Sequence, residues 1–130
     1  MYRYLNVNPS NRTTDDCLIR AIAIIFGISW EKAYTDLCNY GLLIHDMPNK
    51  DSTLSLYLRE RGFKRYVMPD CPACYTIREF AEEHPYGDYI LLTSGHAVPL
   101  INGTYYDTTD SGDEILTYYW KEERNGNDLQ

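Results

Sequence analysis

The segment from Asp16 to Phe26 is apolar on nearly every face of a helix, and no other stretch constrains the fold as strongly. Its apolar residues are Leu18, Ile19, Ala21, Ile22, Ala23, Ile25 and Phe26. A helix with apolar residues all round must be buried, so we predict that this segment is the central helix of the fold. Thr14 or Asp15 can cap its N-terminus, and Gly27 can end it.

Other helix signals occur in the first two-thirds of the chain. Ser29 precedes a segment with apolar residues at helical spacing, and Gly41 is placed to end that helix. Thr76 followed by Glu79 forms a capping box, which marks the start of another helix. From these patterns we expect helices at 30–40, 52–61 and 77–84, with a strand at 63–68.

From residue 89 onward the pattern changes to strands, which we expect at 89–93, 96–101, 104–107 and 115–121. Asn102-Gly103 is a strong hairpin signal between the second and third of them. The chain therefore predicts an α+β domain over residues 1–121, with N-terminal helices packed on a C-terminal antiparallel β-sheet. Residues 122–130 form a polar tail.

Composition narrows the classes of function. The 130 residues include 12 Lys and Arg against 19 Asp and Glu, a net charge of −7. This acidity argues against a nucleic-acid or anionic-membrane partner, and no window is apolar enough to span a membrane. The N-terminus lacks the apolar region of a secretory signal, and the four cysteines have no disulfide-framework spacing, so we expect a cytoplasmic protein. An acyl-transfer enzyme, a thiol-redox protein and a binding module remain.

Cys17 lies in the first turn of the predicted central helix. The positive end of a helix dipole favours a thiolate, which is the form of cysteine that attacks a carbonyl carbon. The neighbouring acids Asp15 and Asp16 would raise the pKa of the thiol unless they point away. Cys17 also fits a second interpretation, a small side chain buried in the core.

His96 begins an apolar strand directly after the small residues Ser94 and Gly95. Asp107 follows eleven residues later, across the predicted hairpin, so we expect the two side chains to face each other. An acid beside an imidazole fixes its tautomer and supports the imidazolium form. Asp110, three residues further on, is a rival for this role.

The order of a cysteine on a buried helix, a histidine on a strand and an acid on the next strand resembles that of papain-like cysteine peptidases. The segment 14–23, with its Asp16-Cys17 pair, is similar to the nucleophile helix of the bacteriocin-leader peptidase branch. His96-Ala97-Val98 and Tyr106-Asp107 are similar to the histidine and acid motifs of that branch. The chain also resembles short proteins of phages and gut bacteria that have no stated function.

This resemblance implies a papain-like fold and a catalytic triad of Cys17, His96 and Asp107. It implies hydrolysis of a peptide, isopeptide or amide bond in a peptide or protein substrate, without a cofactor. Papain-like enzymes place a Gln six residues before the nucleophile to help hold the oxyanion. Asn11 stands there instead, with the same amide on a shorter arm, and Leu18-Ile19 replace the Gly-Pro of the branch.

Two other functions remain open. Cys71-Pro72-Ala73-Cys74 is a CxxC motif between a predicted strand and a predicted helix, as in thiol-disulfide oxidoreductases. A zinc site would need two more ligands, and Cys38 and His45 lack matching spacing, so we expect no metal. The third possibility is a papain-like domain of phage origin that binds or inhibits a target without turnover.

Overall fold

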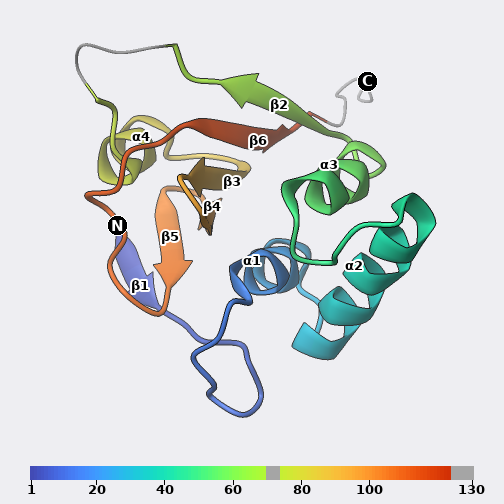
Figure 1. Ribbon diagram of the computed structural model, residues 1–130. Coiled ribbons are helices and arrows are strands. Elements are labelled where there is room, and N and C mark those ends of the chain that lie inside the picture. The colour runs from blue at the N-terminus through green and yellow to red at the C-terminus, as the bar shows by residue number, and fades with distance from the viewer. Residues whose placement is uncertain (70–73, 124–130) are drawn as a thin grey trace.

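The computed structural model describes residues 1–69 and 74–123, and in this part of the chain it shows four helices and six strands in an α+β arrangement (Figure 1). The elements are β1 (Tyr2–Tyr4), α1 (Cys17–Phe26), α2 (Trp30–Ile44), α3 (Asp51–Arg59), β2 (Phe63–Val67), α4 (Ile77–Glu83), β3 (Asp88–Thr93), β4 (His96–Ile101), β5 (Thr104–Asp107) and β6 (Tyr118–Glu122). The α+β class predicted from the sequence is therefore confirmed.

The sheet is mixed, so the expectation of a purely antiparallel C-terminal sheet is wrong. Its strand order is β1-β5-β4-β3-β6-β2, with β1 parallel to β5 and the other neighbours antiparallel. The backbone N–H groups of Tyr105 and Leu5 donate to the carbonyl oxygens of Met1 and Asp107, at 2.9 and 3.1 Å, and fix β1 on this edge. The sequence does not reveal β1, because a strand of three residues is too short to show a periodicity and its partner lies about a hundred residues away.

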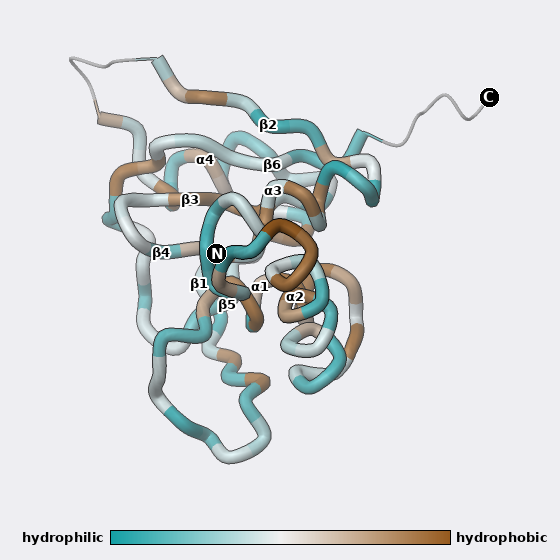
Figure 2. Tube along the Cα trace, turned by 45° about the vertical axis from the view of Figure 1, so that its right-hand side comes forward, coloured by the Kyte–Doolittle hydropathy of each residue, from teal (hydrophilic) through white to brown (hydrophobic). Residues whose placement is uncertain are grey.

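Helices cover both faces of the sheet (Figure 1). Ile90 and Leu92 of β3 pack with α1, α2 and α3, whereas Tyr89 and Leu91 of the same strand pack with α4. A strand buried on both faces is expected to be apolar without alternation, and β3 is coloured as hydrophobic in Figure 2. The central place predicted for α1 is confirmed, since Ala21 and Ile22 have no exposed surface.

The end of α2 differs from the prediction, because the helix continues through Gly41 to Ile44. It ends at His45, which adopts the left-handed conformation with φ 58°. Gly41 has a different reason to be glycine: a Cβ at this position would lie 2.6 Å from the backbone oxygen of Asp46. The glycine therefore allows the chain after α2 to fold back closely over the helix.

Two of the other predicted signals are confirmed. Thr76 and Glu79 form a reciprocal capping box at the start of α4. Asn102 and Gly103 both have positive φ, 48° and 82°, as a tight hairpin between β4 and β5 requires.

Within the described residues, no helix combines the length and apolar character needed to cross a membrane. Of the predicted polar tail, residues 124–130 lie outside the described part of the chain.

The buried position of α1 predicts the effect of removing core volume there. Ile22→Ala should lower the free energy of unfolding by about 2–5 kcal/mol, because the cavity left among fully packed neighbours cannot collapse. Leu42→Ala, at a position that is 75% exposed on α2, should change it by less than about 0.5 kcal/mol. Urea denaturation of both variants measures the difference, and equal losses would contradict the assignment of the core.

Candidate active site

The ends of one helix and two strands meet at one end of the inner strands of the sheet. Cys17 is the first residue of α1, His96 the first of β4 and Asp107 the last of β5. Helix α1 packs on β4, and β4 pairs with β5 in the antiparallel sense, so these ends lie together. A two-residue turn, Ser94-Gly95, joins Thr93 to its partner His96 and fixes the start of β4. The fold thus brings together residues separated by up to 90 positions.

The imidazole of His96 contacts the carboxylate of Asp107, with 2.6 Å between Nε2 and Oδ2. Their relation is diagonal rather than directly opposite, because Leu100 pairs with Tyr105 and this register places Val98 across from Asp107. A diagonal neighbour on adjacent strands is still within reach of a long side chain. The rival acid, Asp110, instead accepts a hydrogen bond from the Tyr105 hydroxyl at 2.8 Å.

His96 lies between Asp107 and Cys17. Hydrogen bonds with the Asp107 carboxylate and, secondarily, with the Cys17 side chain raise the pKa of His96 to about 10, against partial burial, which acts to lower it. Because Nε2 contacts Asp107, Nδ1 is the ring nitrogen left for the sulfur. The side chain of His96 therefore lies between the Asp107 carboxylate, which it contacts, and Cys17, which is close enough to raise its pKa.

Asp107 is almost completely buried, with 1% of its surface exposed. Burial acts to raise its pKa, but the hydrogen bond with His96 and further donors bring the pKa below its ordinary value. Its Oδ2 also accepts from the Ser111 hydroxyl at 2.8 Å, and Oδ1 accepts from the Thr108 backbone N–H at 2.7 Å. These donors fix the carboxylate in the charged form that His96 faces.

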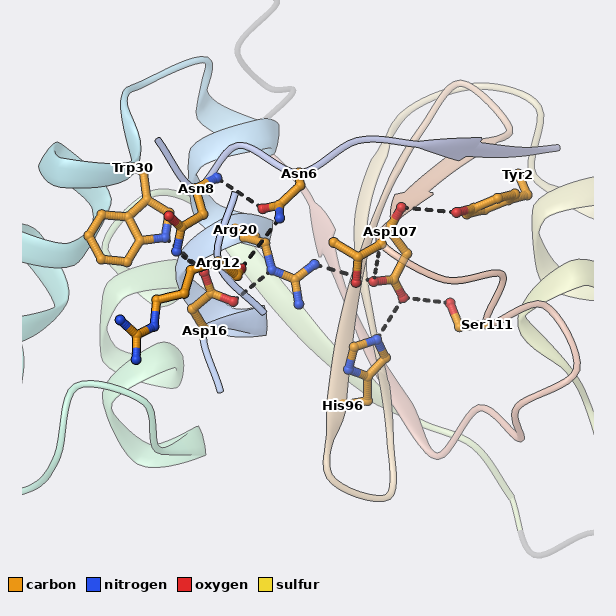
Figure 3. A network of polar contacts seen from close by, with 11 residues as sticks. Tyr2, Asn6, Asn8, Arg12, Asp16, Arg20, Trp30, His96, Asp107 and Ser111 are labelled. Atoms are coloured by element: carbon orange, nitrogen blue, oxygen red, sulfur yellow. Dashed lines mark hydrogen bonds and ion pairs between the residues drawn. The ribbon is translucent and has the colours of Figure 1, made fainter. Parts of the chain in front are cut away.

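Arg20 joins this carboxylate to a second buried one (Figure 3). Its guanidinium lies 3.3 Å from Asp107 Oδ1 through Nη1 and 2.8 Å from Asp16 Oδ1 through Nε. The other oxygen of Asp16 accepts from the Trp30 indole at 2.9 Å and from the Asn8 amide at 3.2 Å. Buried charges are tolerated when paired and hydrogen-bonded in this way.

This network corrects the predicted start of α1. Its N-cap residue is Asp16, not Thr14 or Asp15, and the Asp16 side chain makes no capping hydrogen bond. Burial acts to raise the pKa of Asp16, and the hydrogen bonds from Arg20, Trp30 and Asn8 bring it below its ordinary value. The carboxylate is thus committed to the buried network and is unavailable to the helix end.

Sequence reasoning missed Arg20, although one signal for it existed. Asp16 and Arg20 stand four residues apart on a helix that is otherwise apolar, the spacing of an ion pair on one helix face. A charged pair on a helix that must be buried indicates an internal salt bridge. Ser111 and Asn8, which lie in irregular segments, carry no comparable signal.

Cys17 and His96 line a hollow of about 220 Å³, which we call the central hollow. Its other lining residues are Asp15, Leu18, Asn49, Asp51, Leu92, Thr93 and Gly95. Asn11, expected to help hold an oxyanion, is not among them: it is exposed, with φ 54°, and its backbone N–H donates to the Asn8 carbonyl. Asn49, which sequence reasoning did not select, lines this hollow, and its side-chain amide donates to the Asp15 carboxylate at 3.4 Å.

Cys71, Pro72 and Ala73 of the CxxC motif are outside the described residues, and Cys74 is exposed. In residues 1–69 and 74–123, no group of three metal-ligating side chains is placed to hold an ion.

The comparisons with known proteins found no match for this chain among protein-family models, curated proteins or solved structures.

The raised pKa of His96 predicts how stability depends on pH. The folded protein holds the imidazolium up to a pKa of about 10, against 6.5 for an ordinary histidine. The charged His96 should therefore stabilise the folded state fully below pH 6.5, and this contribution to the free energy of unfolding should disappear as the pH rises toward 10. We expect the difference in unfolding free energy between wild type and His96→Gln to shrink between pH 6 and 10 in urea denaturation. A difference independent of pH would contradict this assignment.

The buried network predicts that Arg20→Met destabilises the fold by about 3–5 kcal/mol, because Asp16 and Asp107 would remain buried without their shared cation. Lys32→Met provides the matched control, since Lys32 forms an exposed ion pair with Asp36 at 2.8 Å. That variant should lose about 0–1 kcal/mol. Thermal or urea unfolding distinguishes the two, and a small loss for Arg20→Met would show that the network is dispensable.

Proposed function

We propose that this chain is a papain-like cysteine hydrolase that cleaves a peptide or related amide bond in a peptide or protein substrate. The observation that carries the proposal is the position of His96, with Asp107 on one ring nitrogen and Cys17 beside the imidazole in the same hollow. The central hollow supports it, because it gives a substrate access to both reacting groups. Cysteine and imidazole in contact, with an acid behind the imidazole, suit nucleophilic catalysis.

The first chemical step is acylation of Cys17. In the reactive form the proton of the Cys17 thiol is already on His96 Nδ1, as the imidazolium, and the thiolate attacks the substrate carbonyl carbon to form a tetrahedral oxyanion. The backbone N–H of Cys17 stands at the N-terminus of α1, where helix N–H groups have no intrahelical partner and can donate to this oxyanion. The Asn49 amide is the second donor that we assign, in place of Asn11.

Collapse of the tetrahedral species breaks the carbon–nitrogen bond. The imidazolium of His96 returns its proton to the departing amine, and a thioester to Cys17 remains. Water then attacks the thioester with His96 as the base, which releases the carboxylic acid and regenerates the thiol. Asp107, bonded to Nε2, keeps Nδ1 directed at the sulfur in both half-reactions.

The proposal predicts rapid alkylation of Cys17 by iodoacetamide at pH 6. An ordinary thiol is almost fully protonated at this pH, but a thiolate paired with the His96 imidazolium reacts. Labelling mapped by mass spectrometry should fall by on the order of tenfold or more in His96→Ala. Cys38 on α2, which is half-buried, serves as the internal standard.

His45→Asn is the matched control, because His45 is exposed at the end of α2 and lines no part of the central hollow. Asn tolerates the left-handed backbone there, so the labelling of Cys17 should stay at the wild-type rate. Slow labelling of Cys17 in both wild type and His96→Ala would overturn the proposed function. Fast labelling at Cys71 or Cys74 instead would favour the thiol-redox alternative.

A further inference from the structure

Two more hollows adjoin the central one. One, of about 330 Å³, shares Asp15 and Asn49 with it, and the other, of about 670 Å³, shares Thr93 and His96. The two outer hollows have no lining residue in common. The reacting groups therefore lie between two recesses, an arrangement that suits a chain passing across Cys17 with side chains on either side.

The smaller outer hollow, which we call the Trp30 hollow, has an apolar and aromatic wall. Ile19, Trp30, Tyr34, Met47 and Pro48 contribute to it. The rings of Trp30 and Tyr34 are stacked, with centroids 5.1 Å apart, and the indole is fixed by its hydrogen bond to Asp16. Tyr34 and Met47 are 43% and 58% exposed, so this wall is open to a ligand. Such a wall suits an aliphatic stem.

The junction between the Trp30 hollow and the central hollow is acidic. The Asp15 carboxylate is exposed there and receives a long hydrogen bond, 3.4 Å, from the Asn49 amide. Asp51 lines the central hollow as well. Among the described residues that line these two hollows there is no Lys or Arg, and His96 is their sole basic side chain. A cation entering here meets carboxylates and aromatic rings.

We propose that the Trp30 hollow is a substrate subsite for a lysine or arginine side chain beside the bond that Cys17 attacks. The side chain passes Asp15 at the junction, and its stem and cationic end lie against Trp30 and Tyr34, beside the Asp15 carboxylate. This inference rests on the proposed function, because it assigns the residue next to the reacting carbonyl. Asp16, which also lines this hollow, is neutralised by Arg20 and leaves Asp15 as the recognising acid.

The test compares two electrophiles that differ in one charge. N-acetyl-lysine chloromethyl ketone carries the cation, and its norleucine counterpart has the same carbon stem without it. Wild type should be alkylated at Cys17 about tenfold faster by the lysine reagent, as an exposed ion pair together with a cation–π contact implies. The rates are read by intact-mass and peptide mass spectrometry.

The ratio of the two rates is the readout, because a general change in the reactivity of Cys17 cancels in it. Asp15→Asn should reduce the ratio to about threefold or less, and Tyr34→Ala should reduce it as well. Glu82→Gln removes the same charge from an exposed position on α4, outside the hollows, and should leave the ratio at the wild-type value. A ratio that falls equally in Glu82→Gln would show an effect of net charge and overturn the subsite.

Parallel labelling with iodoacetamide separates this inference from the proposed function. Fast iodoacetamide labelling of Cys17 with equal rates for the two ketones would overturn the subsite and leave the hydrolase proposal intact. Slow labelling of Cys17 by all three reagents would overturn both. A lysine preference that persists in Asp15→Asn would overturn the assignment of Asp15.

Discussion

The ion pair network around Arg20 is the interaction on which the site depends. One guanidinium joins Asp16, at the start of α1, to Asp107, at the end of β5, and both carboxylates are almost fully buried. With a protonated His96 the two acids face two cations, so the cluster is neutral as a whole. Within this cluster the contact with the Asp107 carboxylate is the main cause of the raised pKa of His96. The ion pairs of Arg20 thus hold α1 against the β4–β5 hairpin and also set the charges around the candidate site.

The sheet supplies the rest of the geometry of the candidate site through one short turn and one edge strand. Ser94-Gly95 precedes His96, and the edge strand β1 pairs along β5 as far as Asp107. Burial of β3 and β4 on both faces fixes their register, because a shift by one residue would exchange the side chains packed under α1 with those under α4. The positions of His96 and Asp107 are therefore set by core packing as well as by hydrogen bonds.

Features that depend on neighbouring residues could be predicted from the sequence. Features that depend on residues distant along the chain could not. The apolar pattern of α1, the capping box of α4 and the Asn102-Gly103 turn need only neighbouring residues, and each is present. The parallel pairing of β1 and the burial of Arg20 depend on partners about a hundred and 87 residues away. Gly41 looked like a helix end by residue type alone, whereas its role comes from the close return of the chain at Asp46. The spacing from Cys17 singles out Asn11, but spacing alone does not show the path of the loop that carries it.

The large sequence separation between Arg20 and Asp107 determines when the candidate site can form during synthesis. Arg20 and Asp107 stand 87 residues apart, and neither can lose its hydration without the other. During synthesis, α1 emerges from the ribosome long before β4 and β5, so a nascent helix carries Cys17 without His96 beside it and Arg20 without Asp107. Closing so long a loop is slow compared with forming a helix. Cys17 and His96 are thus brought together only in a chain whose N-terminal and C-terminal halves have met.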